Sequence, residues 1–319
     1  MKIVIPDDYQ NAVRTLDAFG KLEGHEVTIY NDTVTDIDIL AARFQEADAL
    51  VLIRERTAIS AELLARLPNL KFISQTGRTV PHIDLAACTQ RGIPVAAGSG
   101  SPYAPAELTW ALIMAATRNL PQEIASMKAG KWQTTLGWGL HGHTLGILGY
   151  GKIGALVANY GRAFGMRVIA YGREGSQSRA HADGFETVNS QRELFAQSDV
   201  LSVHLKLVDD TRGIVTRDDL AVMKPTALFV NTSRAELVVS GTLEAALQAG
   251  RPGFAAVDVY EDEPVRDHPL LHMENVICAP HLGYVEKDSY ELYFGTAFDQ
   301  LLAFFAGSPI NILNQEALK

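Results

Sequence analysis

The sequence predicts an α/β protein built on parallel sheets, and three observations support this class. Short runs rich in β-branched residues alternate with helical patterns along almost the whole chain, as expected of βαβ units. The chain has 319 residues, enough for about two domains. Its content of 47% hydrophobic and 20% charged residues is typical of a folded globular protein and argues against disordered and fibrous classes.

Residues 1–98 contain the first alternating series and form one expected unit. The predicted strands are 2–5, 26–30, 49–53, 71–75 and 94–96, with helical segments between them. A Gly-Ser-Gly-Ser-Pro run at 98–102 then suits a turn or linker, so we place a boundary between 98 and 99. The apolar helix that follows, over 107–118, is too short to span a membrane. We expect it to pack against the core, another domain or another subunit.

A second alternating series begins at Thr144. The predicted strands are 145–148, 167–171, 200–204, 227–231, 255–259 and 276–279. These six strands are enough for a complete doubly wound sheet. The chain becomes helical again over 287–307, and this last helix could return to the first unit.

Composition and charge disfavour several function classes. The net charge of −9 disfavours a nucleic-acid binder, which needs a basic face for the phosphates. Cys88 and Cys278, the only cysteines, lie in apolar segments and favour a reducing compartment. The first residues are predicted to form a strand and not a signal peptide. No apolar run reaches the roughly 18 residues of a membrane span. We therefore expect a cytoplasmic protein, and no metal site, because Cys, His and carboxylates nowhere cluster with ligand spacing.

A G-x-G-x-x-G motif directly follows the predicted strand 145–148 and opens a helix, which is the context of a dinucleotide-binding turn. Its first glycine would permit the tight turn, its second the approach of the backbone to a pyrophosphate, and its third close packing of helix on strand. The helix N-terminus would offer N–H donors to the phosphates. The residues expected to line the cofactor here are Gly149, Tyr150, Gly151, Lys152, Ile153 and Gly154. Glycines that merely form a turn are the alternative.

The end of strand 167–171 bears on the choice between NAD and NADP. NAD-binding proteins carry an acidic residue there for the ribose hydroxyls, but this chain has Gly172. Arg173 and Ser176 would instead bind a 2′-phosphate, which favours NADP. Glu174 is close enough for a shifted loop to restore ribose binding, so NAD stays open.

Three polar residues, Arg234, Glu263 and His281, each follow a predicted strand of the second series, at the edge where open α/β sheets build their sites. They belong to motifs through which the sequence resembles the D-isomer-specific 2-hydroxyacid dehydrogenase family over nearly its whole length. The four motifs, in the family's order and spacing, are Thr144 to Gly154, Met223 to Arg234, Asp258 to Pro264 and Pro280 to Gly283.

The resemblance implies a fold and an activity. The fold would be a Rossmann-type doubly wound domain, 99–288, inserted into a smaller flavodoxin-like α/β substrate domain formed by 1–98 and 289–319. The activity would be the NAD(P)-dependent interconversion of a small, anionic D-2-hydroxy acid and its 2-keto acid. The working form would be a homodimer, with contacts from the helix Ala104 to Arg118 and the segment up to Trp132. A dinucleotide-sensing protein, similar to co-repressors of the same fold, is the alternative.

The resemblance also implies a role for each site residue. His281 would be the general acid/base, Glu263 would fix its tautomer and favour its protonated form, and Arg234 would bind the substrate carboxylate. Asp258 would lie near the nicotinamide carboxamide. The other expected contacts are His204, Lys206 and Thr232 for the cofactor, and Arg54, Arg56, Gly77, Arg78, Thr79 and Tyr284 for the substrate. Lys206, Thr79 and Tyr284 replace a proline, a glycine and a small residue that are usual in the family.

Overall fold

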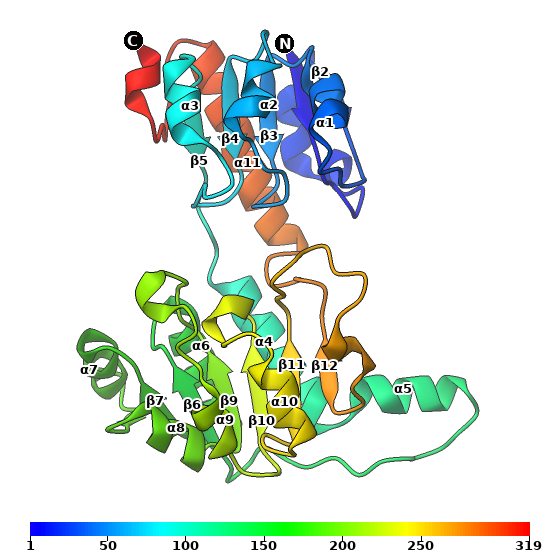
Figure 1. Cartoon of the computed structure of the whole chain (residues 1–319), viewed down its shortest axis with the longest axis vertical. Coiled ribbons are helices and arrows are strands. Elements are labelled where there is room, and N and C mark those ends of the chain that lie inside the picture. Colours follow the sequence, from blue (N-terminus) through cyan, green and yellow to red (C-terminus); the bar gives the residue numbers. More distant parts are fainter. The chain divides into compact units, whose positions relative to one another are not determined.

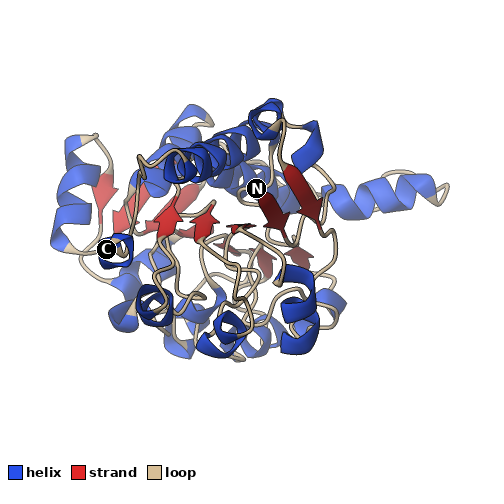
Figure 2. Ribbon diagram, turned by 90° about the horizontal axis from the view of Figure 1, so that it is seen from above, coloured by secondary structure: helices blue, strands red, loops and turns tan.

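The computed structural model describes all residues from 1 to 319 and divides into two compact units. Unit 1 comprises residues 1–101 and 286–319, and unit 2 comprises residues 102–285. Unit 2 begins at Pro102, the residue directly before the first helix of that unit. In both units the strands lie between helices (Figure 2). None of the helices combines the length and the apolar character that crossing a membrane requires.

Unit 1 is built on five parallel strands in the order β2-β1-β3-β4-β5 (Figure 1). The strands are β1 (Lys2–Ile5), β2 (Glu26–Ile29), β3 (Ala49–Leu52), β4 (Phe72–Gln75) and β5 (Val95–Ala97). All five were predicted from the sequence. Their order is the flavodoxin-like one, in which the strand sequence reverses between β1 and β3. Every residue of β3 and β4 is buried, as parallel strands covered on both faces require.

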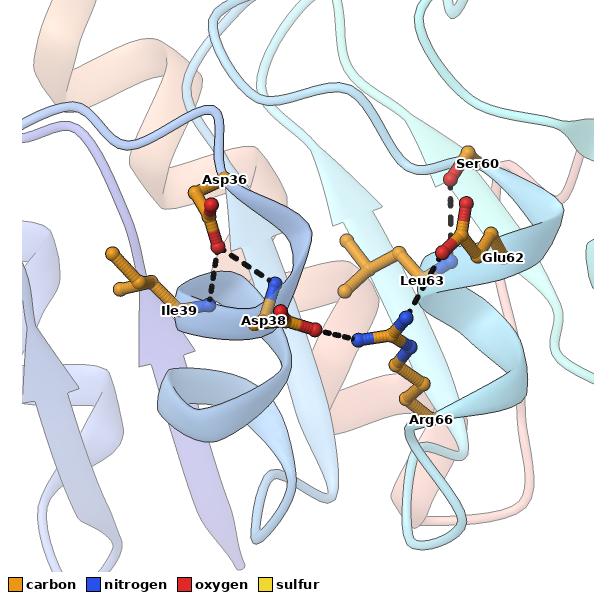
Figure 3. Close-up of polar contacts among 7 residues, drawn as sticks. All are labelled: Asp36, Asp38, Ile39, Ser60, Glu62, Leu63 and Arg66. Carbon is orange, nitrogen blue, oxygen red and sulfur yellow. Dashed lines mark hydrogen bonds and ion pairs between the residues drawn. The ribbon is translucent and has the colours of Figure 1, made fainter.

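The helices of unit 1 are α1 (Ile37–Phe44), α2 (Ala61–Ala65), α3 (Leu85–Gln90) and α11 (Lys287–Phe305), with the 3₁₀ helices η1 (Val13–Thr15), η2 (Asp17–Leu22) and η6 (Gln315–Leu318). Side chains cap the first two (Figure 3): Asp36 accepts hydrogen bonds from two backbone N–H groups of α1, and Ser60 accepts one from α2. Arg66 pairs with Asp38 and Glu62 and so joins the two helices. Each cap contributes about 1 kcal/mol to helix stability, and such exposed ion pairs contribute less.

Helix α11 packs against β3, β4 and β5 of unit 1. The buried hydroxyl of Ser74 lies 3.0 Å from the carbonyl oxygen of Ala297 and 2.8 Å from Gln300 Oε1. Gln300 Nε2 donates to the carbonyl oxygen of Ala97 over 2.8 Å. Because buried polar groups must find partners, these bonds fix the position of α11 on the sheet.

Unit 2 is built on seven parallel strands in the order β12-β11-β10-β9-β6-β7-β8. They are β6 (Thr144–Leu148), β7 (Arg167–Tyr171), β8 (Glu186–Thr187), β9 (Val200–Val203), β10 (Leu228–Asn231), β11 (Phe254–Val257) and β12 (Val276–Cys278). The order reverses between β6 and β9, which is where doubly wound sheets bind ligands. Six of the seven strands were predicted. The sequence did not predict β8, because an exposed edge strand of two residues carries no apolar pattern.

Helices cover both faces of this second sheet. They are α4 (Tyr103–Thr117), α5 (Leu120–Lys128), α6 (Lys152–Ala163), α7 (Glu174–Ala182), α8 (Gln191–Gln197), α9 (Arg217–Ala221) and α10 (Thr242–Gln248), with the 3₁₀ helices η3 (Asp209–Thr211), η4 (Ala235–Leu237) and η5 (Pro269–His272). Ile113 of α4 and Val157 of α6 belong to one buried core, and Phe195 of α8 and Leu220 of α9 to the other. Helix α4 starts four residues before the predicted position 107, because Pro105 fits the first turn of a helix.

Residues 119–139, here called the arm, project from the rest of unit 2 (Figure 1). None of the residues of α5 is buried, and Trp132 and Leu136 are 73% and 96% exposed. Glu123 organises the arm, because its carboxylate accepts hydrogen bonds from the backbone N and the hydroxyl of both Thr134 and Thr135. These bonds lower the pKa of Glu123. The arm is therefore an ordered segment that presents large apolar side chains to solvent.

Candidate active site

The glycine turn follows β6, beside the switch point of the unit 2 sheet. Gly149 has a φ of +96°, and a Cβ atom there would lie 2.8 Å from the carbonyl oxygen of His204. A Cβ on Gly154 would lie 2.4 Å from the carbonyl oxygen of Gly149, whereas one on Gly151 would meet nothing within 4 Å. Helix α6 begins at Lys152, and its first N–H groups lack partners within the helix. This turn requires glycine at positions 149 and 154 and is open at Gly151 beside a helix N-terminus, so it fits a pyrophosphate.

Tyr150 fastens the turn to helix α7. Its backbone N donates to Ser176 Oγ over 2.8 Å, and its carbonyl oxygen accepts from Arg179 Nη2 over 3.0 Å. Its hydroxyl donates to Asp183 Oδ2 over 2.7 Å, and burial together with this carboxylate raises its pKa. We expected Tyr150 and Ser176 to contact the cofactor, and in the structure they hold the turn in shape.

The end of β7 carries the residues that bear on the choice of cofactor. A Cβ on Gly172 would lie 2.9 Å from Ser176 Oγ, so an acidic side chain has no room there unless Ser176 moves. The exposed guanidinium of Arg173 pairs with Asp210 of η3, with 3.2 Å between Nη2 and Oδ2. Sequence analysis did not identify Asp210, because this residue follows β9 and not β7.

His204 and Lys206 follow β9, next to the turn. His204 Nε2 lies 2.8 Å from Ser202 Oγ. Burial lowers the pKa of His204 to about 3, so its imidazole is neutral near pH 7. Lys206 is exposed, and its carbonyl oxygen accepts from Thr211 Oγ1 over 2.6 Å. His204 therefore contributes the shape of the turn, and Lys206 a positive charge at the surface beside it.

His281 and Glu263 form a close pair in the loops that follow β12 and β11. His281 Nδ1 lies 2.6 Å from Glu263 Oε2, and Glu263 Oε1 accepts a hydrogen bond from the backbone N of Tyr260 over 3.1 Å. The φ of His281 is +52°, a left-handed conformation that is uncommon for a residue with a Cβ atom. Such strained backbone positions concentrate at functional sites. The carboxylate thus orients the imidazole through Nδ1 and leaves Nε2 for a ligand.

The pKa of Glu263 is lowered even though burial acts to raise it. The hydrogen bond from His281 and its charge, the Tyr260 N–H and the charge of Arg234 together outweigh that burial. Glu263 is therefore ionised at neutral pH. An ionised carboxylate at Nδ1 selects the tautomer that is protonated on Nδ1 and stabilises the imidazolium.

Asp258 fixes the loop that carries His281. Its buried carboxylate accepts hydrogen bonds from the backbone N of Leu282 over 2.7 Å and of Gly283 over 2.9 Å. Burial raises the pKa of Asp258 to about 6, against the effect of these two bonds and of the charge on His281. The family resemblance implies that Asp258 lies near the nicotinamide carboxamide. In the structure both of its oxygens contact the loop of His281.

Of the remaining expected residues of unit 2, Arg234 and Tyr284 interact with this pair, and Thr232 contacts helix α4. Arg234 follows β10, and its carbonyl oxygen accepts from Asn231 Nδ2 over 2.8 Å. The hydroxyl of Thr232 lies 2.7 Å from that of Thr109 on α4. The buried ring of Tyr284 meets that of His281 edge-on, with 5.5 Å between the centroids. Arg234 and Tyr284 are thus associated with the His281–Glu263 pair, by charge and by direct contact respectively.

The switch point of unit 1 lies between β1 and β3. Arg56, after β3, donates from Nη1 to the carbonyl oxygen of Asp7, after β1, over 2.6 Å. The Arg56 guanidinium also lies 4.2 Å from the ring centroid of Tyr9. The buried carboxylate of Asp7 accepts hydrogen bonds from the hydroxyls of Thr33 and Thr57. These contacts join the loops that follow β1, β2 and β3 and hold Arg56 in one orientation.

The loop after β4 lies beside Arg54. Gln75 Nε2 donates to the carbonyl oxygens of Arg54, over 2.7 Å, and Thr79, over 3.3 Å. A Cβ on Gly77 would lie 3.4 Å from Arg54 Nη1. Gln75 Oε1 is buried without a hydrogen-bond partner in the protein, and the neighbouring Arg78 is exposed. The structure therefore brings Arg54 together with the Gly77–Thr79 loop.

Comparison with known proteins identifies the family. Residues 110–283 match the family model described as D-isomer specific 2-hydroxyacid dehydrogenase, NAD binding domain. A glyoxylate reductase of Aeropyrum pernix is 38% identical over 295 residues, which cover 88% of this chain and 87% of that protein. The chain belongs to the D-isomer-specific 2-hydroxyacid dehydrogenase family. Members of this family are nicotinamide-dinucleotide-dependent oxidoreductases that act on small 2-hydroxy or 2-keto acids.

One further relative of this dehydrogenase is much longer than this chain, and one solved structure matches it almost from end to end. A D-3-phosphoglycerate dehydrogenase of Methanocaldococcus jannaschii is 36% identical over 287 residues, which cover 89% of this chain and 53% of that protein. The chain thus spans about half the length of that relative. A crystal structure of an oxidoreductase from Ralstonia solanacearum has a TM-score of 0.97 and 56% identity, and the match covers 100% of this chain and 98% of that one.

Sequence analysis of this dehydrogenase missed two groups of residues. Asp7 and Tyr9 belong to a polar run directly after the first strand, and the rule that sites follow strands at a switch point could have found them. Asp210 offered no such signal, because exposed acidic residues in loops are common and its contact to Arg173 depends on the order of the strands.

Proposed function

We propose that this dehydrogenase interconverts a small D-2-hydroxy acid and its 2-keto acid with NAD or NADP. The observation that carries the proposal is the His281–Glu263 pair, at 2.6 Å, in the same unit as the glycine turn. Unit 2 is the proposed dinucleotide domain and unit 1 the proposed substrate domain. When bound, the nicotinamide dinucleotide supplies or accepts the hydride.

His281 is the proposed acid/base. Since Glu263 accepts the Nδ1 proton, Nε2 is the nitrogen that exchanges a proton with the substrate oxygen. During reduction, Nε2 donates its proton to the keto oxygen as negative charge develops there. During oxidation, Nε2 accepts the hydroxyl proton, and Glu263 stabilises the imidazolium that results.

Arg234 is the proposed anchor of the substrate carboxylate. Its planar guanidinium can bind a carboxylate through two parallel N–H···O bonds, which lysine cannot do. Its charge contributes to the lowered pKa of Glu263, which supports a position near the proposed acid/base. Arg234 would therefore hold the reacting carbon close to His281.

The arginines of unit 1 favour a substrate with a second anionic group. Arg54 and Arg56 follow β3, and Arg78 follows β4, so three guanidinium groups lie near the carboxyl ends of adjacent strands. Tyr9 and the carbonyl oxygen of Asp7 already hold one of them in place. We therefore expect 2-ketoglutarate and phosphohydroxypyruvate to be better substrates than glyoxylate.

For the cofactor we propose a preference for NADP, supported by the glycine at position 172 and the guanidinium at position 173. The proposed working form is a homodimer that forms through the arm. The arm carries exposed apolar side chains, among them those of Trp132 and Leu136. A second copy of the chain would therefore complement the arm by covering these side chains.

Initial rates with NADH and NADPH against glyoxylate, hydroxypyruvate, pyruvate, 2-ketoglutarate and phosphohydroxypyruvate test the proposed activity. His281→Ala should lower kcat by about 10³-fold, because the proton donor is lost. Its affinity for NADH, measured by fluorescence, should stay within about twofold of wild type. Unchanged turnover in this variant would exclude His281 as the acid/base. Dinucleotide binding by the wild type without turnover of any keto acid would favour a sensor.

A further inference from the structure

An ion pair joins the two loops on either side of the glycine turn. Strand β6, which carries the turn, lies between β9 and β7 in the sheet. Arg173 directly follows Gly172 at the end of β7, and Asp210 lies in η3, which follows β9. Their side chains are 73% and 81% exposed, with 3.2 Å between Nη2 and Oδ2. A carboxylate thus reaches the end of β7 from a different loop.

A carboxylate at position 172 would require Ser176 to move. A Cβ there would lie 2.9 Å from Ser176 Oγ, which is held by the backbone N of Tyr150. An acidic residue at 172 would therefore displace the helix residue that fastens the glycine turn. Asp210 is the acidic residue that the structure places against Arg173 instead.

Arg173 can exchange its ion-pair partner for a ligand more easily than Arg179 can give up its backbone contact. The nearby Arg179 donates from Nη2 to the carbonyl oxygen of Tyr150, a backbone contact that fixes the turn. Arg173 is held only at an exposed carboxylate, and such exposed ion pairs are weak. A phosphate, with its higher charge, competes well for a guanidinium in this situation.

We propose that Asp210 lowers the selectivity for NADP over NAD that Gly172 and Arg173 favour. Its carboxylate occupies the Arg173 guanidinium and repels a 2′-phosphate, so NADP binds only by breaking the pair. NAD has no group that competes for Arg173, and its binding leaves the pair intact. This inference rests on the proposed role of Arg173 at the 2′-phosphate.

The test is the affinity for NADPH and NADH in Asp210→Asn, Arg173→Ala and the double variant, measured by energy transfer from protein tryptophan to the bound nicotinamide at low ionic strength. Asp210→Asn should strengthen NADPH binding about fivefold or more and leave NADH binding within about twofold, because one repulsive charge is removed. Asp209→Asn, on the same 3₁₀ helix, is the matched control for the change in net charge. We define the affinity ratio as the affinity for NADPH divided by that for NADH. In the Arg173→Ala background, Asp210→Asn should change the logarithm of this ratio by less than half as much as it does in the wild type.

The outcomes separate this inference from the proposed function. If the affinity ratio changes equally in Asp210→Asn and Asp209→Asn, the proposed role of Asp210 is wrong. It is also wrong if the ratio changes in neither variant. If Arg173→Ala leaves the ratio at the wild-type value, the assignment of Arg173 to the 2′-phosphate fails as well. If the wild type binds neither dinucleotide, the proposed cofactor itself is wrong.

Discussion

At the scale of single residues, the contact between Glu263 and His281 sets the orientation of the proposed acid/base. Replacing Glu263 by Gln removes the carboxylate that holds Nδ1 and stabilises the positive charge that develops on the ring during proton transfer. We expect kcat at pH 7 to fall by about 10²-fold.

The check is the kcat of the reduction at pH 7 for wild type and Glu263→Gln. Asp262→Asn is the control, because it removes a neighbouring exposed carboxylate and should leave kcat unchanged. A kcat of Glu263→Gln equal to that of the wild type would contradict the proposed role of the carboxylate.

Asp258 makes folding stability depend on pH in the opposite sense to an ordinary ion-paired carboxylate. Its pKa is about 6 in the folded protein, and an unfolded Asp has a pKa of roughly 4. The folded chain therefore binds more protons between these values, and stability is lost as pH rises from 4 to 6. Above pH 6 the ionised, buried group costs on the order of 3 kcal/mol relative to an unshifted one.

Asp258→Asn removes this charge and keeps one of the two backbone hydrogen bonds. The free energy of unfolding of the variant minus that of wild type should therefore increase between pH 4.5 and 7, as measured by urea denaturation at several pH values. The lost hydrogen bond adds an offset that does not depend on pH. A difference that stays constant over this range would show that Asp258 is not shifted.

Position after a strand was enough to place His281, Glu263 and Arg234 at one edge of a sheet, because polar residues that follow parallel strands meet there. Their individual roles were implied by the motifs that resemble the dehydrogenase family. The contacts of Asp7 to Thr33 and Thr57 could not be predicted, because they join loops distant in sequence. The same holds for the contact between Asp210 and Arg173.

At the scale of elements, the turn between β6 and α6 tolerates only glycine at its first position. Gly149→Ala would place a Cβ at a φ of +96° and 2.8 Å from the carbonyl oxygen of His204. We expect a loss of about 1–3 kcal/mol in the free energy of unfolding and at least tenfold weaker NADH binding. Gly139→Ala, where nothing lies within 4 Å, should change neither quantity. Wild-type affinity in Gly149→Ala would exclude this turn as the pyrophosphate site.

Strands and helices with strong apolar patterns were predicted, and the exceptions have physical causes. Most strands of the two units carry buried apolar runs, while the predicted edge strands β2 and β12 are only partly buried. The order of the strands follows the rules for parallel sheets. Strand β8 has no such run because it lies exposed at the edge of its sheet. The sequence suggested that α11 could return to the first unit but did not show how, because the contacts of Ser74 and Gln300 that fix it are tertiary.

At the scale of the whole molecule, the arm is the feature that a lone copy of the chain does not explain. Leu136 is almost fully exposed and Trp132 is largely exposed, and both lie on a segment that Glu123 keeps ordered. Exposed apolar side chains on an ordered segment mark an interaction surface. A flexible loop could bury such side chains against its own unit, but the hydrogen bonds of Glu123 to Thr134 and Thr135 give this segment a defined shape, and it projects from the rest of unit 2 (Figure 1).

If the arm binds a second copy, Trp132→Asp combined with Leu136→Asp should shift the protein from dimer to monomer in sedimentation equilibrium. Charges buried in an apolar contact without partners cost several kcal/mol, so the dissociation constant should rise by at least 10²-fold. The far-UV circular dichroism should stay unchanged, because both side chains are exposed within one chain. Leu318→Asp, an exposed apolar residue outside the arm, is the matched control and should remain dimeric. A dimer in the double variant, or a wild type that is monomeric at micromolar concentration, would contradict the role of the arm.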